Sequence, residues 1–158
     1  MQEGLSFRQV MGAFPTGVTV VAALGEDGRP HGLTVNSFTS VSLDPPLVLV
    51  CIDRAASTHD ILVEAPTFTV SILGAHQTEL ATRFAFDPPH ARFREEEWGE
   101  RPDGALVPQG SAAWLLCDPE AVHEGGDHSI LVGRVRFMGV GDAEALVFYH
   151  GRYGAVSP

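Results

Sequence analysis

The chain has no lysine: its ten basic residues are all arginines, set against twenty carboxylates, and the net charge is −10. Without a lysine amine the chain can form neither a Schiff base nor a P-loop, so a bound phosphate would need arginine, hydroxyl or backbone N–H groups. Nucleic-acid binding is excluded as well. Such proteins gain much of their affinity from clustered basic residues that neutralise phosphates, and no basic run is present.

Cysteine is scarce, and long apolar runs are missing. Cys51 and Cys117 stand alone in apolar segments, with no CxxC pair and no histidine at ligand spacing, which predicts two buried free thiols and no metal site. The longest apolar runs, residues 18–24 and 47–52, are too short to span a bilayer. The opening Met-Gln-Glu lacks the basic start and apolar segment of a secretory signal. We therefore expect a cytoplasmic protein without membrane association.

The 158 residues, of which 44% are hydrophobic and 19% charged, are typical of one globular domain spanning residues 1–158. Apolar and β-branched runs predict six or seven short strands, at residues 18–24, 31–42, 47–52, 67–73, 112–117, 129–139 and 145–149. The run at 47–52 is expected to be fully buried. Helical spacing of apolar residues predicts short helices at residues 6–13, 57–65 and 77–86.

Hairpin signals separate these strands, with Asp-Gly at 27–28 and Gly-Gly-Asp at 125–127. The pattern indicates a mainly β fold, an antiparallel barrel with a few peripheral short helices, rather than alternating βαβ units. Residues 87–110 are rich in Pro, Gly, Arg and Glu and show little periodicity. We expect them to form a long loop over the surface.

Two segments offer chemistry. The strand at residues 34–42, TVNSFTSVS, concentrates hydroxyl and amide groups that could line a polar cofactor, although an edge strand facing water explains them equally. His128 follows a Gly-Gly-Asp turn and could contact a ring or an amide, or simply point to water. HExxH, GxSxG and GxGxxG are all absent, which argues against a zinc protease, a serine hydrolase and a Rossmann dinucleotide site.

Four motifs occur in a fixed order: FPTGVTVV at 14–21, HGLTVNSFTSVSLDPPLVLV at 31–50, GGDH at 125–128 and YHGRY at 149–153. Together they make the chain resemble the short-chain flavin reductase family, over residues 7–154. Members of that family include the reductase components of two-component monooxygenases. The resemblance implies an FMN-binding split barrel, antiparallel and Greek-key-like, that is usually a homodimer.

The resemblance also implies a set of cofactor-binding residues. Residues 34–40 would run along the flavin, the backbone at 51–53 would edge its ring system, and residues 57 and 58 would meet its phosphate. His128, the one implied catalytic residue, would face the nicotinamide, and Tyr153 would close the site near it. The residues so implied are Thr34, Asn36, Ser37, Phe38, Ser40, Cys51, Ile52, Asp53, Ser57, Thr58, Arg83, Phe84, His128 and Tyr153.

On this reading the protein is an NAD(P)H-dependent flavin reductase. It transfers hydride from NADH or NADPH to FMN or FAD and supplies reduced flavin to a partner monooxygenase. The lack of lysine favours NADH, because the 2′-phosphate of NADPH needs a nearby cation. Two alternatives remain: a flavin-binding electron-transfer module, and an oxidase like pyridoxamine-phosphate oxidase. The second alternative usually needs several basic residues for its phosphorylated substrate.

Overall fold

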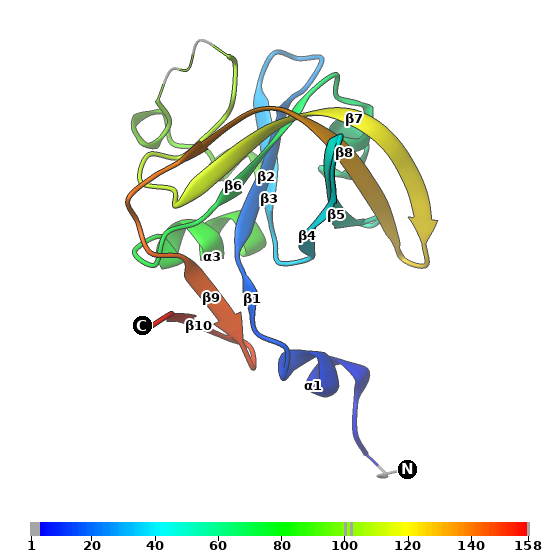
Figure 1. Cartoon of the computed structure of the whole chain (residues 1–158), viewed down its shortest axis with the longest axis vertical. Coiled ribbons are helices and arrows are strands. Elements are labelled where there is room, and N and C mark those ends of the chain that lie inside the picture. The colour runs from blue at the N-terminus through cyan, green and yellow to red at the C-terminus, as the bar shows by residue number, and fades with distance from the viewer. Residues whose placement is uncertain (1–3, 100, 102, 158) are drawn as a thin grey trace.

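The structure is a computed structural model that describes residues 4–99, 101 and 103–157. Within these ranges the elements are three α-helices, two 3-10 turns and ten strands (Figure 1). The helices are α1 (Phe7–Gly12), α2 (His59–Glu64) and α3 (Thr78–Phe86), and the 3-10 turns are η1 (Pro89–Ala91) and η2 (Glu95–Glu97). The strands are β1 (Thr16–Gly17), β2 (Thr19–Leu24), β3 (Pro30–Val35), β4 (Phe38–Leu43), β5 (Pro46–Asp53), β6 (Phe68–Ile72), β7 (Ala113–Gly125), β8 (His128–Val140), β9 (Leu146–Tyr149) and β10 (Arg152–Ala155).

Seven of these strands form one antiparallel sheet in the order β3-β2-β6-β7-β8-β5-β4, and the other three form a small sheet in the order β1-β9-β10. The mainly β antiparallel class is therefore as predicted. No α-helix in the described ranges is long and apolar enough to cross a membrane. The short strands β1 and β10 were not predicted, because two to four residues carry too little periodicity to stand out.

The expected single strand at residues 31–42 is wrong. The chain leaves β3 at Val35, which pairs with Thr19, and starts β4 at Phe38, which pairs with Val50 at the opposite edge of the sheet. Only residues 36 and 37 join the two edges. β3 pairs with β2 and β4 pairs with β5, so this link carries the chain from one edge of the sheet to the other.

The core has two parts on either side of β2. Val21, Val50, Phe68 and Leu131 lie in the cluster inside the barrel. Val20, with other residues of β2, faces a second cluster beneath α3. β2 is thus buried on both faces, which suits its mostly apolar sequence.

β5 is not fully buried, contrary to expectation. Val48, Val50 and Ile52 face the core, whereas Leu47, Leu49 and Cys51, which alternate with them, are half-buried. Alternating burial is the normal result of the two-residue period of a strand with one face toward a core. The outer face of β5 therefore carries apolar side chains that the chain itself covers only in part.

The segment at 87–110 is anchored to the barrel rather than lying loosely over the surface. Phe93 and Trp98 pack against Phe84 of α3, with ring centroids 4.8 Å and 5.7 Å from it. Ala105 and Val107 are buried further along the segment. Isolated aromatic residues in a polar stretch show no periodicity, so the sequence carried no sign of this anchoring.

Candidate active site

Three strand ends meet at one region of the barrel. The register pairs Phe38 of β4 with Val50 of β5, and Asp53 at the end of β5 with His128 at the start of β8. The Ser37 hydroxyl donates to the carbonyl oxygen of Cys51 (2.8 Å), which ties the start of β4 to the end of β5. Segments distant in the sequence, near residues 37, 52 and 128, are therefore neighbours.

The turn that follows β5 is fastened to the tip of the β7–β8 hairpin. The backbone N–H of Arg54 donates to the carbonyl oxygen of Asp127 (2.9 Å), and the Asp53 carboxylate accepts the N–H of Ala55 (2.9 Å). Gly126 lies in the hairpin turn with a φ of +67°, a conformation that L side chains rarely adopt. The hairpin thereby presents His128 beside the turn.

Thr58 closes that turn and has an unusual environment. It is 1% exposed, and its hydroxyl has no hydrogen-bond partner among the residues that the structure describes. A buried hydroxyl without a partner costs about 1–3 kcal/mol, so proteins rarely keep one unless it has another use. Its position just before α2 agrees with the sequence-based expectation that residues 57 and 58 meet a phosphate.

Several of the expected polar side chains are free to bind a ligand. Asn36, Ser40 and Ser57 are exposed, and their side chains make no hydrogen bond within the described part of the chain. Ile52, in contrast, is fully buried in the barrel, so only its backbone could take part. The hydroxyl and amide groups suit a polar cofactor and can hold an anion without lysine.

His128 is half-exposed, and its Nδ1 lies 2.7 Å from Oδ1 of Asp127. A carboxylate can only accept, so Nδ1 carries the hydrogen and the other ring nitrogen, Nε2, is left for a ligand. The same hydrogen bond lowers the pKa of the Asp127 carboxyl. Asp127, which sequence reasoning treated only as a turn residue, orients the imidazole.

Thr34, Arg83 and Phe84 do not join this region through their side chains. The Thr34 hydroxyl donates to the carbonyl oxygen of Ala81 in α3 (2.6 Å). Arg83 is 2% exposed and forms ion pairs with Glu79 and Glu97. Phe84 is fully buried in the aromatic cluster described above. Arg83 and Phe84 could meet a ligand only through their backbone, because their side chains are committed to the fold.

Tyr153 is a further departure from the expected site. It lies on β10, packs on Phe148 with a centroid distance of 5.5 Å, and belongs to the edge of the second core cluster. Figure 1 places β10 at the lower left and the tip of the β7–β8 hairpin at the right. Within one chain Tyr153 therefore does not close a site at His128.

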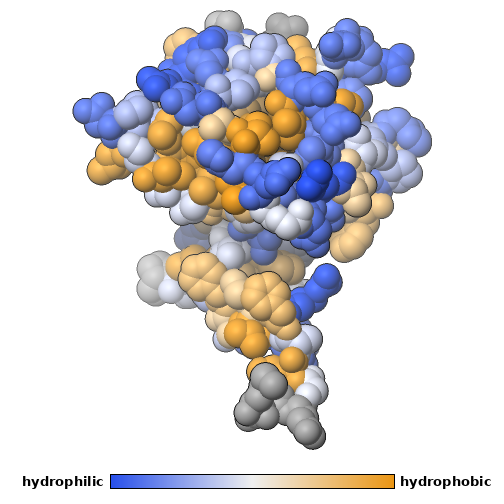
Figure 2. Space-filling view, turned by 90° about the vertical axis from the view of Figure 1, so that its right-hand side faces the viewer, coloured by the Kyte–Doolittle hydropathy of each residue, from blue (hydrophilic) through white to orange (hydrophobic). Residues whose placement is uncertain are grey.

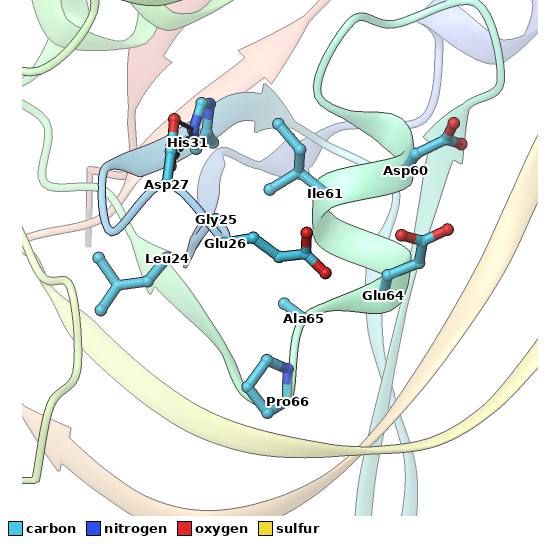
Figure 3. A pocket seen from close by; sticks show the side chains of 10 residues that line it. All are labelled: Leu24, Gly25, Glu26, Asp27, His31, Asp60, Ile61, Glu64, Ala65 and Pro66. Atoms are coloured by element: carbon cyan, nitrogen blue, oxygen red, sulfur yellow. Dashed lines mark hydrogen bonds and ion pairs between the residues drawn. The ribbon is translucent and has the colours of Figure 1, made fainter.

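Two cavities lie elsewhere. One of about 550 Å³ lies between the β2–β3 turn and α2, and its lining includes the acidic Glu26, Asp60 and Glu64 and the apolar Ile61 (Figure 3). Another, of about 710 Å³, lies between the same turn and the anchored segment at 87–110, beside Trp98. Neither contains the residues gathered near His128. We place the candidate site by its residues and not by the cavities.

Comparison with known proteins agrees with this geometry. Residues 11–157 match the family model described as "Flavin reductase like domain". The chain therefore belongs to the flavin reductase-like family.

Individual relatives are reductases. The chain is 41% identical to the stachydrine N-demethylase reductase subunit Stc3 of Rhizobium meliloti, over 96% of this chain and 66% of that protein. It is 42% identical to the FMN reductase (NADH) SmoA of Agrobacterium fabrum, over 96% of this chain and 86% of that protein. The solved NADH:FAD oxidoreductase SgcE6 of Streptomyces globisporus, in complex with NAD and FAD fragments, superposes with a TM-score of 0.88 at 42% identity, covering 96% of this chain and 91% of that one.

The family match and the solved relative confirm the expected family and the expected fold. The chain spans just under two thirds of Stc3 and 47% of two further relatives, so some members of the family carry additional sequence.

Proposed function

We propose that this protein is an NADH-dependent flavin reductase that passes hydride to FMN or FAD. One observation carries the proposal: the free amide of Asn36 just before β4, the Thr58 hydroxyl, which has no partner among the described residues, and His128 lie where three strand ends meet. The relatives act on the same cofactors, as an FMN reductase (NADH) and an NADH-dependent FAD reductase.

The chemistry itself is supplied by the cofactors: hydride passes from the nicotinamide to the flavin ring without a protein nucleophile. The protein binds and orients. Asn36, Ser37 and Ser40 would hydrogen-bond polar groups of the flavin, while Ser57 and Thr58 would hold its phosphate. His128, oriented by Asp127, would position the nicotinamide through its free ring nitrogen.

NADH is the preferred donor on electrostatic grounds. The 2′-phosphate of NADPH needs a neighbouring cation, and the chain has ten arginines and no lysine against twenty carboxylates. Of these arginines, Arg83, Arg134 and Arg136 are already paired with carboxylates. Comparing kcat/KM for the two donors at one ionic strength tests this preference, and equal or better use of NADPH would contradict it.

A second copy of the chain would complete the molecule. The apolar side chains Leu5, Phe7, Val10, Met11 and Phe14 on and around α1 are 47–81% exposed, and they contribute to the apolar surface in the lower part of the molecule (Figure 2). No residue of α1 is buried by the chain itself. Since such patches normally mark interfaces, a homodimer covers them. Light scattering that shows an active monomer would overturn this part of the proposal.

Reduced flavin would leave the site and serve a partner monooxygenase. One relative is the reductase subunit HsaB of a flavin-dependent monooxygenase from Rhodococcus jostii, and its role supports this step. We also place the reaction in the cytoplasm, which agrees with two free cysteines.

The proposal is tested by titrating FMN, FAD and riboflavin against the protein while flavin fluorescence is recorded, followed by an assay of NADH oxidation with each flavin. We expect quenching with a low-micromolar Kd or tighter and turnover that depends on flavin. Absence of both quenching and NADH oxidation would refute the function. Quenching without NADH oxidation would indicate a flavin-binding module instead.

A further inference from the structure

His59 links two parts of the candidate site that lie 70 residues apart. Its Nε2 lies 2.8 Å from the hydroxyl oxygen of Ser129, and its Nδ1 lies 2.7 Å from Oδ1 of Asp60. The His59 side chain is 13% exposed and Ser129 is 8% exposed, so the contact between them is largely shielded from water. Neither residue belongs to a motif that the sequence analysis singled out.

The direction of these hydrogen bonds follows from the groups involved. The Asp60 carboxylate can only accept, so Nδ1 of His59 donates to it. In the neutral imidazole Nε2 then has no hydrogen and accepts the Ser129 hydroxyl proton. Asp60 thus fixes the tautomer and the orientation of a ring that reaches into the barrel. Asp60 itself is 85% exposed. In Figure 3 its side chain extends from α2.

The two residues of this contact each lie next to a residue of the candidate site. His59 is the first residue of α2 and directly follows Thr58, whereas Ser129 directly follows His128 in β8. Two further contacts join the same segments: the register pair of Asp53 with His128, and the hydrogen bond from the N–H of Arg54 to the carbonyl oxygen of Asp127 (2.9 Å).

We infer that His59 is a positioning residue: through Ser129 it holds the turn at residues 53–58 against the start of β8. The segment that binds the flavin phosphate and the segment that binds the nicotinamide then keep a fixed position relative to each other. The inference rests on the proposed function for the identity of the ligands. Of the three contacts, the other two are a strand register pair and a backbone hydrogen bond, so His59 with Ser129 is the one that a side-chain substitution can remove.

The test replaces His59 in three ways. His59→Gln keeps a polar group close to the position of Nε2 and can meet Ser129 by donating or accepting. His59→Asn is too short to reach Ser129 but can still donate to Asp60. His59→Ala removes both contacts, Ser129→Ala removes one oxygen from the other partner, and His90→Ala serves as the matched control on an exposed histidine.

We expect His59→Ala, His59→Asn and Ser129→Ala each to raise the Kd for FMN and the KM for NADH by about 5- to 10-fold, with kcat changed less than about twofold. His59→Gln should restore both values to within about twofold, and His90→Ala should change neither. Since His59 and Ser129 act through one contact, the double alanine variant should be no worse than the more severe single variant. A general loss of folding would instead lower the active fraction, and hence kcat, without the rescue by glutamine.

A readout independent of turnover completes the design. In the flavin-free protein the amide hydrogen of Arg54 should exchange faster in His59→Ala and Ser129→Ala than in the unaltered chain, because its acceptor is on the segment that has been released. Unchanged exchange together with unchanged FMN affinity in both variants would overturn the inference while leaving the reductase function intact. If the unaltered chain neither binds FMN nor oxidises NADH, the proposed function fails, and amide exchange still decides whether His59 holds the turn. Should His59→Ala fail to fold, Ser129→Ala, which deletes a single atom, decides the outcome by the same measurements.

Discussion

Replacing Thr58 with valine should have opposite effects on the flavin-free and flavin-bound protein. The Thr58 hydroxyl is buried and has no partner in the described structure, at a cost of about 1–3 kcal/mol. Valine has nearly the same shape and lacks that hydroxyl. We therefore expect Thr58→Val to stabilise the flavin-free protein by about 1–2 kcal/mol, which raises Tm by about 2–8 °C for a chain of this size.

Binding should change in the other direction. A hydrogen bond to a charged group contributes about 1.5–3 kcal/mol, so its loss raises the Kd for FMN by about 10- to 150-fold. Riboflavin has no phosphate, and its Kd should stay the same. Fluorescence titration of the two flavins in parallel, with melting curves recorded without flavin, measures both effects.

Thr69→Val is the matched control, because Thr69 is also buried but its hydroxyl oxygen accepts the N–H of Leu106 (3.0 Å). That substitution leaves a donor without an acceptor and should destabilise the protein by about 1 kcal/mol, with no effect on FMN. The reasoning is refuted if Thr58→Val lowers Tm as the control does, or if it weakens FMN and riboflavin equally.

Four further outcomes follow from the structure. His128→Ala should lower kcat/KM for NADH about 10-fold, or about 1.4 kcal/mol, while the Kd for FMN stays constant, and steady-state kinetics with an unchanged efficiency would contradict its role. Burial raises the pKa of the Cys117 thiol to about 12, so a thiol reagent at pH 8 should label at most one cysteine of the native protein. Because the unfolded thiol ionises first, this raised pKa also makes folding stability decline as pH rises from about 8.5 to the folded pKa, which urea unfolding at stepwise pH can follow. Glu97→Gln removes one carboxylate from the buried Arg83 and should lower the free energy of unfolding, measured with urea, by about 1–3 kcal/mol. The control is Glu95→Gln, at an exposed position. An equal loss of stability in the control would show that the ion pair does not anchor the segment at 87–110.

The sequence alone was sufficient for the class of fold and for the family. Short β-branched runs separated by Asp-Gly and Gly-Gly-Asp turns are local signals, and local signals are what hairpins need. The resemblance to flavin reductases came from four motifs in a fixed order, and such motifs can be compared before the chain is folded.

Only the tertiary structure decided which of those residues share a surface. The run at 31–42 divides at residues 36 and 37, because β3 pairs with β2 at one edge of the sheet and β4 pairs with β5 at the other. A local sequence pattern cannot show this division, because it depends on distant partner strands. Arg83 and Phe84 were expected at the flavin, yet an ion pair and an aromatic contact with the segment at 87–110 occupy their side chains.

The contact between His59 and Ser129 shows the same limit most clearly. Each residue is unremarkable in the sequence, and 70 residues separate them. Their hydrogen bond exists because the antiparallel register of β5 and β8 sets Asp53 opposite His128, and the chain then turns back at once into α2. Sequence determines which groups are present and which strands they favour, whereas the pairing of distant strands determines which groups meet, because register is a property of two segments and not of either one.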